Sequence, residues 1–205
     1  MKLRQLEIQL EKIEGYTCPS PRWEQYQTPA PLAARLLFHA YSRGDIRGKK
    51  VCDLGCGTGI LSIGALILGA SQVTGYDIDE NALDTARKNA ENMRVNPVFI
   101  TGDISDPAFA STVPGFDTVV MNPPFGAQVR HADRPFLDTA LHAGEIVYGI
   151  FNAGSRPFVE KYIQGRGVTA EVTSGIFPLK KTFFFHKKEM QEIYVEIMII
   201  RRLNP

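Results

Sequence analysis

The segment that decides the fold is Lys49-Lys50-Val51-Cys52-Asp53-Leu54-Gly55-Cys56-Gly57-Thr58-Gly59. Its first half is short and apolar enough for a buried strand, and its second half is a loop with glycine at every other position. Residues 60–68 then form an apolar stretch long enough for a helix packed on a sheet. A strand, a glycine loop and a helix in this order form the nucleotide-binding half of a doubly wound α/β fold.

The rest of the chain alternates between helical and strand patterns. Helices are expected over residues 2–14, 31–43, 60–68, 80–92, 136–144 and 156–164, and strands over 49–54, 72–76, 98–101, 116–121, 145–151, 167–173 and 193–200. Asp79 is placed to cap the helix that begins at residue 80. We find no internal repeat and no linker long enough to divide the chain. The alternation predicts a single three-layer, Rossmann-like α/β domain over residues 1–205.

Composition narrows the possible function classes. The chain has 205 residues, of which 44% are hydrophobic and 22% charged, as is ordinary for a globular protein. No apolar run reaches the roughly 18 residues of a membrane span. The amino terminus lacks the hydrophobic region of a signal peptide, so a cytoplasmic location is expected. The three cysteines form no CxxC pair and the four histidines show no ligand spacing, so we expect neither a metal nor a disulfide.

The glycine loop has the spacing GxGxG, where dinucleotide-binding chains have GxGxxG. The closer glycines suit a ligand whose bulk, in place of a phosphate, lies against the backbone. Asp77 ends the next strand, 22 residues beyond Gly55, where a carboxylate can accept hydrogen bonds from both hydroxyls of a ribose. Asp103 ends the third strand on the same edge, beside the backbone of Ile104, where it can accept from an adenine amino group. The alternative role of Asp103 is to cap the turn that follows.

A second candidate site is Asn122-Pro123-Pro124-Phe125, directly after the apolar run 116–121. Neither proline can donate to a strand ladder, so the strand must end here. The Asn122 amide and the carbonyls of Asn122 and Pro123 offer acceptors to the two hydrogens of a planar NH2 group, and Phe125 can stack on the ring that carries it. The alternative is an ordinary strand-ending turn with a packed phenylalanine.

Basic and aromatic residues gather near the carboxyl terminus, although the net charge is only +1. The basic segment, residues 178–188, has no acidic side chain and contains Lys180, Lys181, Phe183, Phe184, Phe185, His186, Lys187 and Lys188. Arg130 and Arg134 lie in the polar loop 126–135, which we interpret as mobile and adjacent to the site. This distribution favours an RNA partner, because lysine and arginine neutralise phosphates.

The order of these motifs resembles that of a class I S-adenosyl-L-methionine-dependent methyltransferase, with residues 53–59 as its glycine motif and Asp77 as its ribose acid. Asn122-Pro123-Pro124-Phe125 resembles the catalytic motif of enzymes that methylate adenine N6. Three further motifs are Glu24-Gln25-Tyr26-Gln27-Thr28, Tyr76-Asp77-Ile78-Asp79 and Phe185-His186-Lys187-Lys188. With them, nearly the whole chain is similar to the small ribosomal-RNA adenine N6-methyltransferases.

This resemblance implies a mostly parallel seven-stranded sheet with an antiparallel last strand, and residues 1–45 that supply helices and a cofactor lid. Together with the motifs it assigns S-adenosyl-L-methionine binding to Gln25, Thr28, Asp53, Gly55, Gly57, Thr58, Gly59, Ile60, Asp77, Asp103 and Ile104, of which Gln25 and Thr28 rest on the resemblance alone. It assigns catalysis to Asn122, Pro123, Pro124 and Phe125, and substrate binding to Phe125, Phe185, His186, Lys187 and Lys188. It also implies a small zinc-containing activator protein as partner, which we expect to bind at the apolar edge strand 98–101.

The expected reaction is transfer of a methyl group from S-adenosyl-L-methionine to the N6 amine of an adenosine in structured RNA, with ribosomal RNA as the favoured substrate. A DNA substrate is also possible, although the chain has no separate domain of the kind that reads a duplex sequence. Two further alternatives remain open. One is methylation of a glutamine side-chain amide in a protein, since an Asn-Pro-Pro-aromatic motif can hold that planar amide too. The other is a cofactor-binding scaffold without catalysis. The basic segment favours RNA, and the intact Asn122 and glycine loop count against the scaffold.

Overall fold

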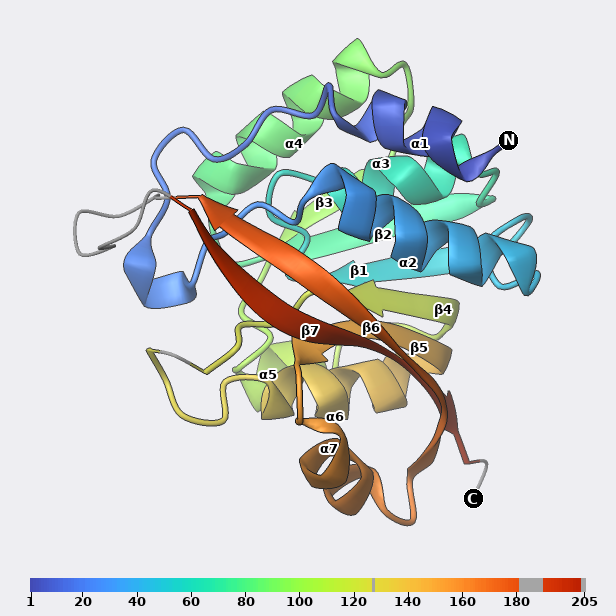
Figure 1. Ribbon diagram of the computed structural model, residues 1–205, viewed down its shortest axis with the longest axis vertical. Coiled ribbons are helices and arrows are strands. Elements are labelled where there is room, and N and C mark those ends of the chain that lie inside the picture. Colours follow the sequence, from blue (N-terminus) through green and yellow to red (C-terminus); the bar gives the residue numbers. More distant parts are fainter. Residues whose placement is uncertain (127, 181–189, 204–205) are drawn as a thin grey trace.

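The centre of the fold is a seven-stranded sheet with the strand order β3-β2-β1-β4-β5-β7-β6 (Figure 1). The computed structural model describes residues 1–126, 128–180 and 190–203. The strands are β1 (Lys50–Leu54), β2 (Gln72–Asp77), β3 (Val98–Thr101), β4 (Phe116–Met121), β5 (Gly144–Asn152), β6 (Gly167–Lys180) and β7 (Met190–Arg202). The pairs from β3 to β5 are parallel, and β7 runs antiparallel to both of its neighbours. The predicted sheet, mostly parallel with an antiparallel last strand, is confirmed.

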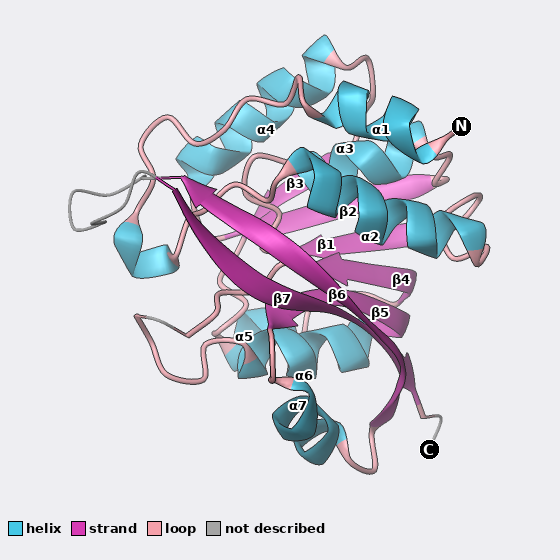
Figure 2. Cartoon of the chain, in the orientation of Figure 1, coloured by secondary structure: helices cyan, strands magenta, loops and turns pink. Residues whose placement is uncertain are grey.

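Helices cover both faces of this sheet (Figure 2). One face carries α1 (Leu3–Leu10), α2 (Ala30–Ser42), α3 (Ile60–Ile67) and α4 (Glu80–Asn92), and the other carries α5 (Pro107–Ala110), α6 (Arg134–Ala143) and α7 (Arg156–Ile163). A 3-10 turn, Pro21–Trp23, lies between α1 and α2 in the sequence. In the part of the chain that the structure describes, no helix is both long and apolar enough to cross a membrane. The predicted three-layer α/β arrangement is confirmed.

Two clusters of buried apolar side chains, one on each face of the sheet, hold the layers together. Leu37 of α2 and Ile63 of α3 belong to the first cluster. Leu137 of α6 and Val159 of α7 belong to the second. The central strands β1 and β4 are buried along almost their whole length, because helices cover both faces of a parallel sheet. Buried residues therefore follow one another almost without interruption in β1 and β4, instead of alternating with exposed residues.

Two elements end four or more residues away from their predicted ends, and β7 begins at Met190, three residues before its predicted start. The first helix ends at Leu10 and not at residue 14. The backbone amides of Lys12 and Ile13 bond to carbonyls three residues back, at Gln9 and Leu10, instead of four. The chain therefore leaves the helix here, and the Ile13 side chain is buried in the core. Strand β6 continues to Lys180, beyond the predicted end at residue 173. Gly175 and Pro178 are unfavourable in strands, but pairing with β7 along the full length of β6 overrides this preference.

Side-chain caps define the starts of two helices. The Asp79 carboxylate accepts a hydrogen bond from the Asn81 amide at 3.0 Å, so the predicted cap of α4 is confirmed. Asp106 accepts in the same way from the Ala108 amide at 2.9 Å and begins α5. The sequence patterns did not predict α5, because a single helical turn is too short to show a period.

Strand β3 forms an edge of the sheet, as expected. Its Val98 and Ile100 side chains are 47% and 37% exposed. An edge strand has unpaired backbone groups on one side, and here it also presents apolar side chains to solvent. The edge therefore has the properties of a surface to which another chain can add a strand.

The register of the central strands brings three loops to the same level. Leu54 of β1 lies opposite Tyr76 of β2 and Met121 of β4. The residues that come next on the three strands are Gly55, Asp77 and Asn122. They lie at the carboxyl edge of the parallel strands, where ligands bind in doubly wound folds.

Candidate active site

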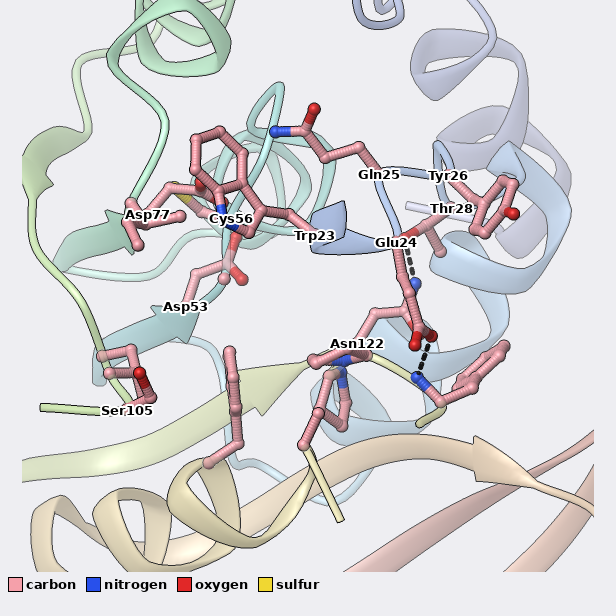
Figure 3. Close-up of a pocket in the computed structure, with 18 of the residues that line it drawn as sticks. Trp23, Glu24, Gln25, Tyr26, Thr28, Asp53, Cys56, Asp77, Ser105 and Asn122 are labelled. Atoms are coloured by element: carbon pink, nitrogen blue, oxygen red, sulfur yellow. Dashed lines mark hydrogen bonds between the residues drawn. The ribbon is translucent and has the colours of Figure 1, made fainter. Parts of the chain in front are cut away.

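A cavity of about 400 Å³ lies at the carboxyl edge of β1, β2, β3 and β4 (Figure 3). Residues 14–28, here called the lid segment, supply another part of its wall. The predicted site residues in the wall are Gln25, Thr28, Asp53, Gly55, Thr58, Ile60, Asp77, Asp103, Ile104, Asn122, Pro123, Pro124 and Phe125. Gly57 and Gly59 belong to the loop that borders it, whereas Phe185, His186, Lys187 and Lys188 lie outside the described residues. The cofactor and acceptor candidates therefore share one cavity.

Gly57 is the most constrained position of the glycine loop. Its φ of 51° lies in the left-handed region. A Cβ atom at this position would lie 2.1 Å from the hydroxyl oxygen of Tyr16 in the lid segment. The Gly57 amide donates a hydrogen bond to Asp77 Oδ2 at 2.7 Å. Only glycine combines this backbone conformation with so close a contact. Gly57 therefore contacts both Tyr16 of the lid segment and Asp77, the acid that ends β2.

Asp53 is a fully buried carboxyl group near the end of β1. Its Oδ2 accepts hydrogen bonds from the amide and the hydroxyl of Ser62, at 2.9 Å and 2.6 Å. Its Oδ1 is buried and has no hydrogen-bond partner in the described part of the chain. Burial raises the pKa of Asp53 to about 7, against the opposing effect of the Ser62 bonds. The cavity wall thus holds an acceptor oxygen that lacks a donor.

Two further acids stand at the ends of β2 and β3. Asp77 Oδ1 accepts from the Asp79 amide at 3.0 Å, and burial raises the pKa of Asp77. Asp103 Oδ1 accepts from the amide and hydroxyl of Ser105, at 2.8 Å and 2.6 Å. Asp103 therefore caps the turn after β3, which was its alternative role, and it also lines the cavity. The two roles are compatible, because the turn uses only one of the two carboxylate oxygens.

Buried amide side chains tie the lid segment to the rest of the site. Gln25, which is 5% exposed, donates to Asp79 Oδ2 at 2.8 Å. Asn89 of α4, which is 2% exposed, exchanges two hydrogen bonds of 3.0 Å with the backbone of Glu14. Its Nδ2 also donates to the Thr58 carbonyl in the glycine loop at 3.0 Å. These bonds hold the lid segment against the glycine loop and α4.

Asn122 lines the cavity, and one acceptor of its side chain has no hydrogen-bond partner in the described part of the chain. Its Nδ2 donates to the hydroxyl oxygen of Thr28 at 3.0 Å (Figure 3). Its Oδ1 is buried and finds no hydrogen-bond partner among the residues described. Because the Thr28 contact occupies the nitrogen end of the amide, the oxygen end remains available for an N–H donor from outside the chain.

Phe125 is held by its backbone and by its ring. Its amide donates to Glu24 Oε2 at 2.7 Å, and its carbonyl accepts from Asn152 Nδ2 at 3.3 Å. Its ring meets Phe177 of β6 edge to face, with the centroids 5.8 Å apart. The Phe125 ring is partly buried and lines the cavity. It is both a packed residue and a surface open to a ligand.

Several residues of the cavity wall have no role in the sequence-based prediction, and Tyr16, Trp23 and Glu24 are among them. Burial and the neighbouring Asp77 carboxylate raise the pKa of Tyr16 well above its ordinary value. Trp23 is 39% exposed. For Glu24 a signal was available, because it begins the motif at residues 24–28, in which only two residues were given roles.

The loop after the acceptor motif contributes His131 to the cavity wall. Arg134, which was predicted to be part of this loop, instead begins α6, and its guanidinium lies over the rings of Phe158 and Tyr162, 5.2 Å and 5.4 Å from their centroids. Arg130 is exposed. Of the two loop arginines that favoured RNA, Arg134 is therefore used in packing against α7, and Arg130 faces solvent.

The chain matches a methyltransferase family profile over part of its length and other proteins over all of it. The profile of the family described as ribosomal protein L11 methyltransferase (PrmA) matches residues 31–122. Protein MJ0284 of Methanocaldococcus jannaschii is 40% identical, over 100% of this chain and 96% of its own length. The crystal structure of PH1948 from Pyrococcus horikoshii, solved as a candidate RNA methyltransferase, has a TM-score of 0.91 and 38% identity, covering 100% of this chain and 99% of that one.

One relative settles the family. The rRNA N(6)-adenosine-methyltransferase METTL5 of Danio rerio is 36% identical, over 97% of this chain and 98% of its own length. The resemblance inferred from the sequence motifs is confirmed by this match, since it spans nearly both whole chains. The chain belongs to the METTL5 family of rRNA N(6)-adenosine-methyltransferases.

Proposed function

We propose that this protein transfers a methyl group from S-adenosyl-L-methionine to the N6 amine of an adenosine in structured RNA, with ribosomal RNA as the substrate. The observation that carries the proposal is the buried Oδ1 of Asn122, which lacks a donor and lies in the same cavity as the glycine loop. An amine hydrogen can be accepted at one end of this cavity while a methyl donor is held at the other. The METTL5 proteins of Danio rerio and Drosophila melanogaster are named for this reaction.

The donors and acceptors of the cavity fit S-adenosyl-L-methionine. When bound, this cofactor supplies a methyl group activated by a sulfonium. Asp53 Oδ1 has no donor in the described structure, so it can accept from the cofactor, and an ionised Asp53 attracts positive charge. Asp77 keeps unused lone pairs for ribose hydroxyls, and Asp103 keeps one oxygen for an adenine amine. The further proposed contacts are Gln25, Thr28, Gly55, Gly57, Thr58, Gly59, Ile60 and Ile104.

The acceptor motif would prepare the amine for attack. The lone pair of adenine N6 is conjugated with the ring and is therefore a poor nucleophile. If Asn122 Oδ1 accepts one amine hydrogen and a backbone carbonyl near Pro123 accepts the other, the nitrogen is favoured in a pyramidal form and is held in line with the methyl group. Pro124 stiffens this frame, and Phe125 offers a face to the base that has left its stack. After transfer the cationic nitrogen loses a proton readily, so the proposal needs no general base.

An RNA substrate is better supported than a protein amide. The PrmA profile ends at residue 122, so it matches the cofactor half of the chain and stops where the acceptor motif begins. Three animal relatives, which match 95% to 97% of the chain, are named for ribosomal RNA. Arg130 is exposed beside the cavity, and the basic segment 178–188, which we propose as a phosphate-binding segment, adds positive charge. A cytoplasmic location stays a prediction from the amino terminus.

We also propose that a small zinc-containing activator protein adds a strand to β3. The edge position of β3 and the exposed side chains of Val98 and Ile100 support this proposal. Backbone hydrogen bonds to an edge strand supply affinity without requiring a preformed pocket. A partner strand in this position would be separated only by β3 from β2, whose last residue is Asp77.

Asp53 should make cofactor affinity depend on pH. With a pKa of about 7, its carboxyl group is mostly protonated at pH 6 and mostly ionised at pH 8, and only the ionised form attracts a cationic ligand. Calorimetry should therefore find that S-adenosyl-L-methionine binds about tenfold more weakly at pH 6 than at pH 8. In Asp53→Asn this pH dependence should disappear. If Asp53→Asn bound the cofactor with the wild-type affinity at pH 6 and also at pH 8, the pH dependence would not come from Asp53, and its proposed role in cofactor binding would be ruled out.

Asp53 should also make the stability of the fold depend on pH. A rise in pH should strengthen cofactor binding but lower the free energy of unfolding. The pKa of about 7 in the folded protein lies above the ordinary 3.8, so ionising Asp53 lowers the free energy of unfolding as the pH rises. The Tm advantage of Asp53→Asn over the wild type should grow between pH 4 and pH 7 and level off above pH 7. Asp84→Asn, at an exposed position on α4, is the matched control. A Tm difference that stays constant with pH would contradict the cause given for the shift.

Asn122→Ala should separate chemistry from cofactor binding. The Asn122 amide is proposed to contact the target amine and not the adenosine part of the cofactor. Cofactor affinity should therefore stay within about threefold, while methyl transfer falls by about two orders of magnitude, or about 2.7 kcal/mol of transition-state stabilisation. The measurement is single-turnover methylation of ribosomal RNA at saturating cofactor, with N6-methyladenosine identified by mass spectrometry of nucleosides. Asn92→Ala, exposed at the end of α4, is the control. A near-wild-type rate in Asn122→Ala would refute the proposed grip on the amine.

The exposed edge of β3 should make the protein poorly soluble when it is expressed without a partner. We expect aggregation at high concentration and a higher soluble yield on co-expression with the zinc-containing activator. Val98→Lys should improve solubility alone and weaken capture of the activator, because lysine protects sheet edges. Ile8→Lys replaces an apolar side chain on helix α1, away from any sheet edge, that is 46% exposed, close to the 47% of Val98, and should change neither property. A wild-type protein that remains monomeric at high concentration and ignores the activator would speak against this interface.

A further inference from the structure

Glu24 joins the lid segment to the acceptor motif (Figure 3). Its Oε2 accepts a hydrogen bond from the Phe125 amide at 2.7 Å, and its Oε1 accepts one from the Gln128 amide at 2.8 Å. The two donors lie 101 and 104 residues further along the chain. Hydrogen bonds from backbone amides to a carboxylate are charge-assisted and stronger than those between neutral groups. One side chain thus holds two points of the loop that follows β4.

The backbone conformation of Glu24 is unfavourable for a glutamate, so the turn alone does not explain why this residue type is present. Glu24 ends the 3-10 turn Pro21–Trp23 with φ 50° and ψ 44°, in the left-handed region. This conformation costs conformational energy for any residue with a Cβ atom, and glycine would adopt it more readily. A glutamate at this position is explained by what its side chain does, which is to hold the amides of Phe125 and Gln128.

The neighbours of Glu24 bind other parts of the site. Gln25 donates to Asp79, in the loop after β2, at 2.8 Å. The Thr28 hydroxyl oxygen accepts a hydrogen bond from the side-chain nitrogen Nδ2 of Asn122 at 3.0 Å. Within five residues, the lid segment is therefore connected to the proposed cofactor side of the cavity, through Gln25, and to the proposed acceptor side, through Glu24 and Thr28.

We propose that Glu24 is a positioning residue that couples closure of the lid segment over the cofactor to the geometry of the acceptor motif. This rests on the proposed function of the cavity. Pro123 and Pro124 stiffen the loop directly after Asn122, and the amide bonds to Glu24 fix it at Phe125 and Gln128. A lid segment that moves away from the cavity would break these two bonds and the Thr28 contact together. Cofactor binding, which favours the closed lid segment, would in this way favour the acceptor geometry and strengthen RNA binding.

Amide hydrogen exchange tests the coupling without any RNA. In the wild type, S-adenosyl-L-homocysteine should slow exchange of the Phe125 and Gln128 amides by about tenfold, because the ligand stabilises the closed lid segment that protects them. Glu24→Gln keeps the size of the side chain but replaces one acceptor oxygen by an NH2 group. In this variant the ligand should no longer protect at least one of the two amides. Glu91→Gln, an exposed position on α4, should behave as the wild type. Equal protection in Glu24→Gln and the wild type would overturn the proposal.

Single-turnover methylation gives the second readout. Glu24→Gln should lower the rate at saturating RNA and cofactor by about tenfold and leave the cofactor Kd within about threefold, as expected for losing one charged hydrogen bond in the acceptor loop. The tightening of RNA binding by S-adenosyl-L-homocysteine should also disappear. Glu24→Asp, whose shorter side chain cannot reach both amides, should show the same losses, so the test does not depend on the folding of one variant.

The outcomes distinguish the two proposals. If the wild type methylates no RNA but its ligand-dependent protection is lost in Glu24→Gln, the proposed function is wrong and the coupling stands. If Glu24→Gln and Glu24→Asp fold, methylate RNA at the wild-type rate and keep the effect of S-adenosyl-L-homocysteine on RNA binding, the coupling is wrong and the proposed function stands.

Discussion

The parallel register of β1 with β2 and β4 is the constraint on which the rest of the site depends. Leu54 faces both Tyr76 and Met121, so three loops begin at the same level on adjacent strands. Strands in a sheet lie about 4.8 Å apart, and their backbone hydrogen bonds hold this spacing before any loop side chain makes a contact. The residues that leave the sheet there are Gly55, Asp77 and Asn122. A shift of one residue in either pairing would move a proposed cofactor group away from the proposed acceptor group.

The cavity has a cost in stability, which the lid segment offsets in part. Asp53 Oδ1 and Asn122 Oδ1 are both buried without a donor in the described structure, although buried polar atoms normally have one. The hydrogen bonds of Gln25 and Asn89 close the lid segment over this edge of the sheet. Two acceptors held in place before a ligand arrives need little rearrangement when donors are supplied. We infer that preorganisation of the site, and not maximal stability, explains these two side chains.

Sequence patterns could predict the elements and the strand-end residues, because both follow from local chemistry. Apolar strands, the glycine loop and Asn122 before two prolines are visible along the chain itself. The contacts of Glu24 and Asn89 were not predictable in this way, since their partners are backbone groups far away in the sequence, and backbone groups have no sequence signature. The length of β6 was missed for a related reason, because pairing with β7 decides it against the local preference of Gly175 and Pro178. The predicted substrate residues 185–188 lie outside the described part of the chain.

The contact between Phe125 and Phe177 has a consequence for the history of the family. The two rings meet edge to face, and Phe177 is only 2% exposed, so neither ring can change size without leaving a void or a clash at the other. Two positions on distant parts of the chain are thereby bound to one another, and relatives should inherit them as a pair. Strand β6, which supplies no group to the proposed reaction, therefore constrains the ring of the proposed acceptor motif through the volume of a single buried side chain.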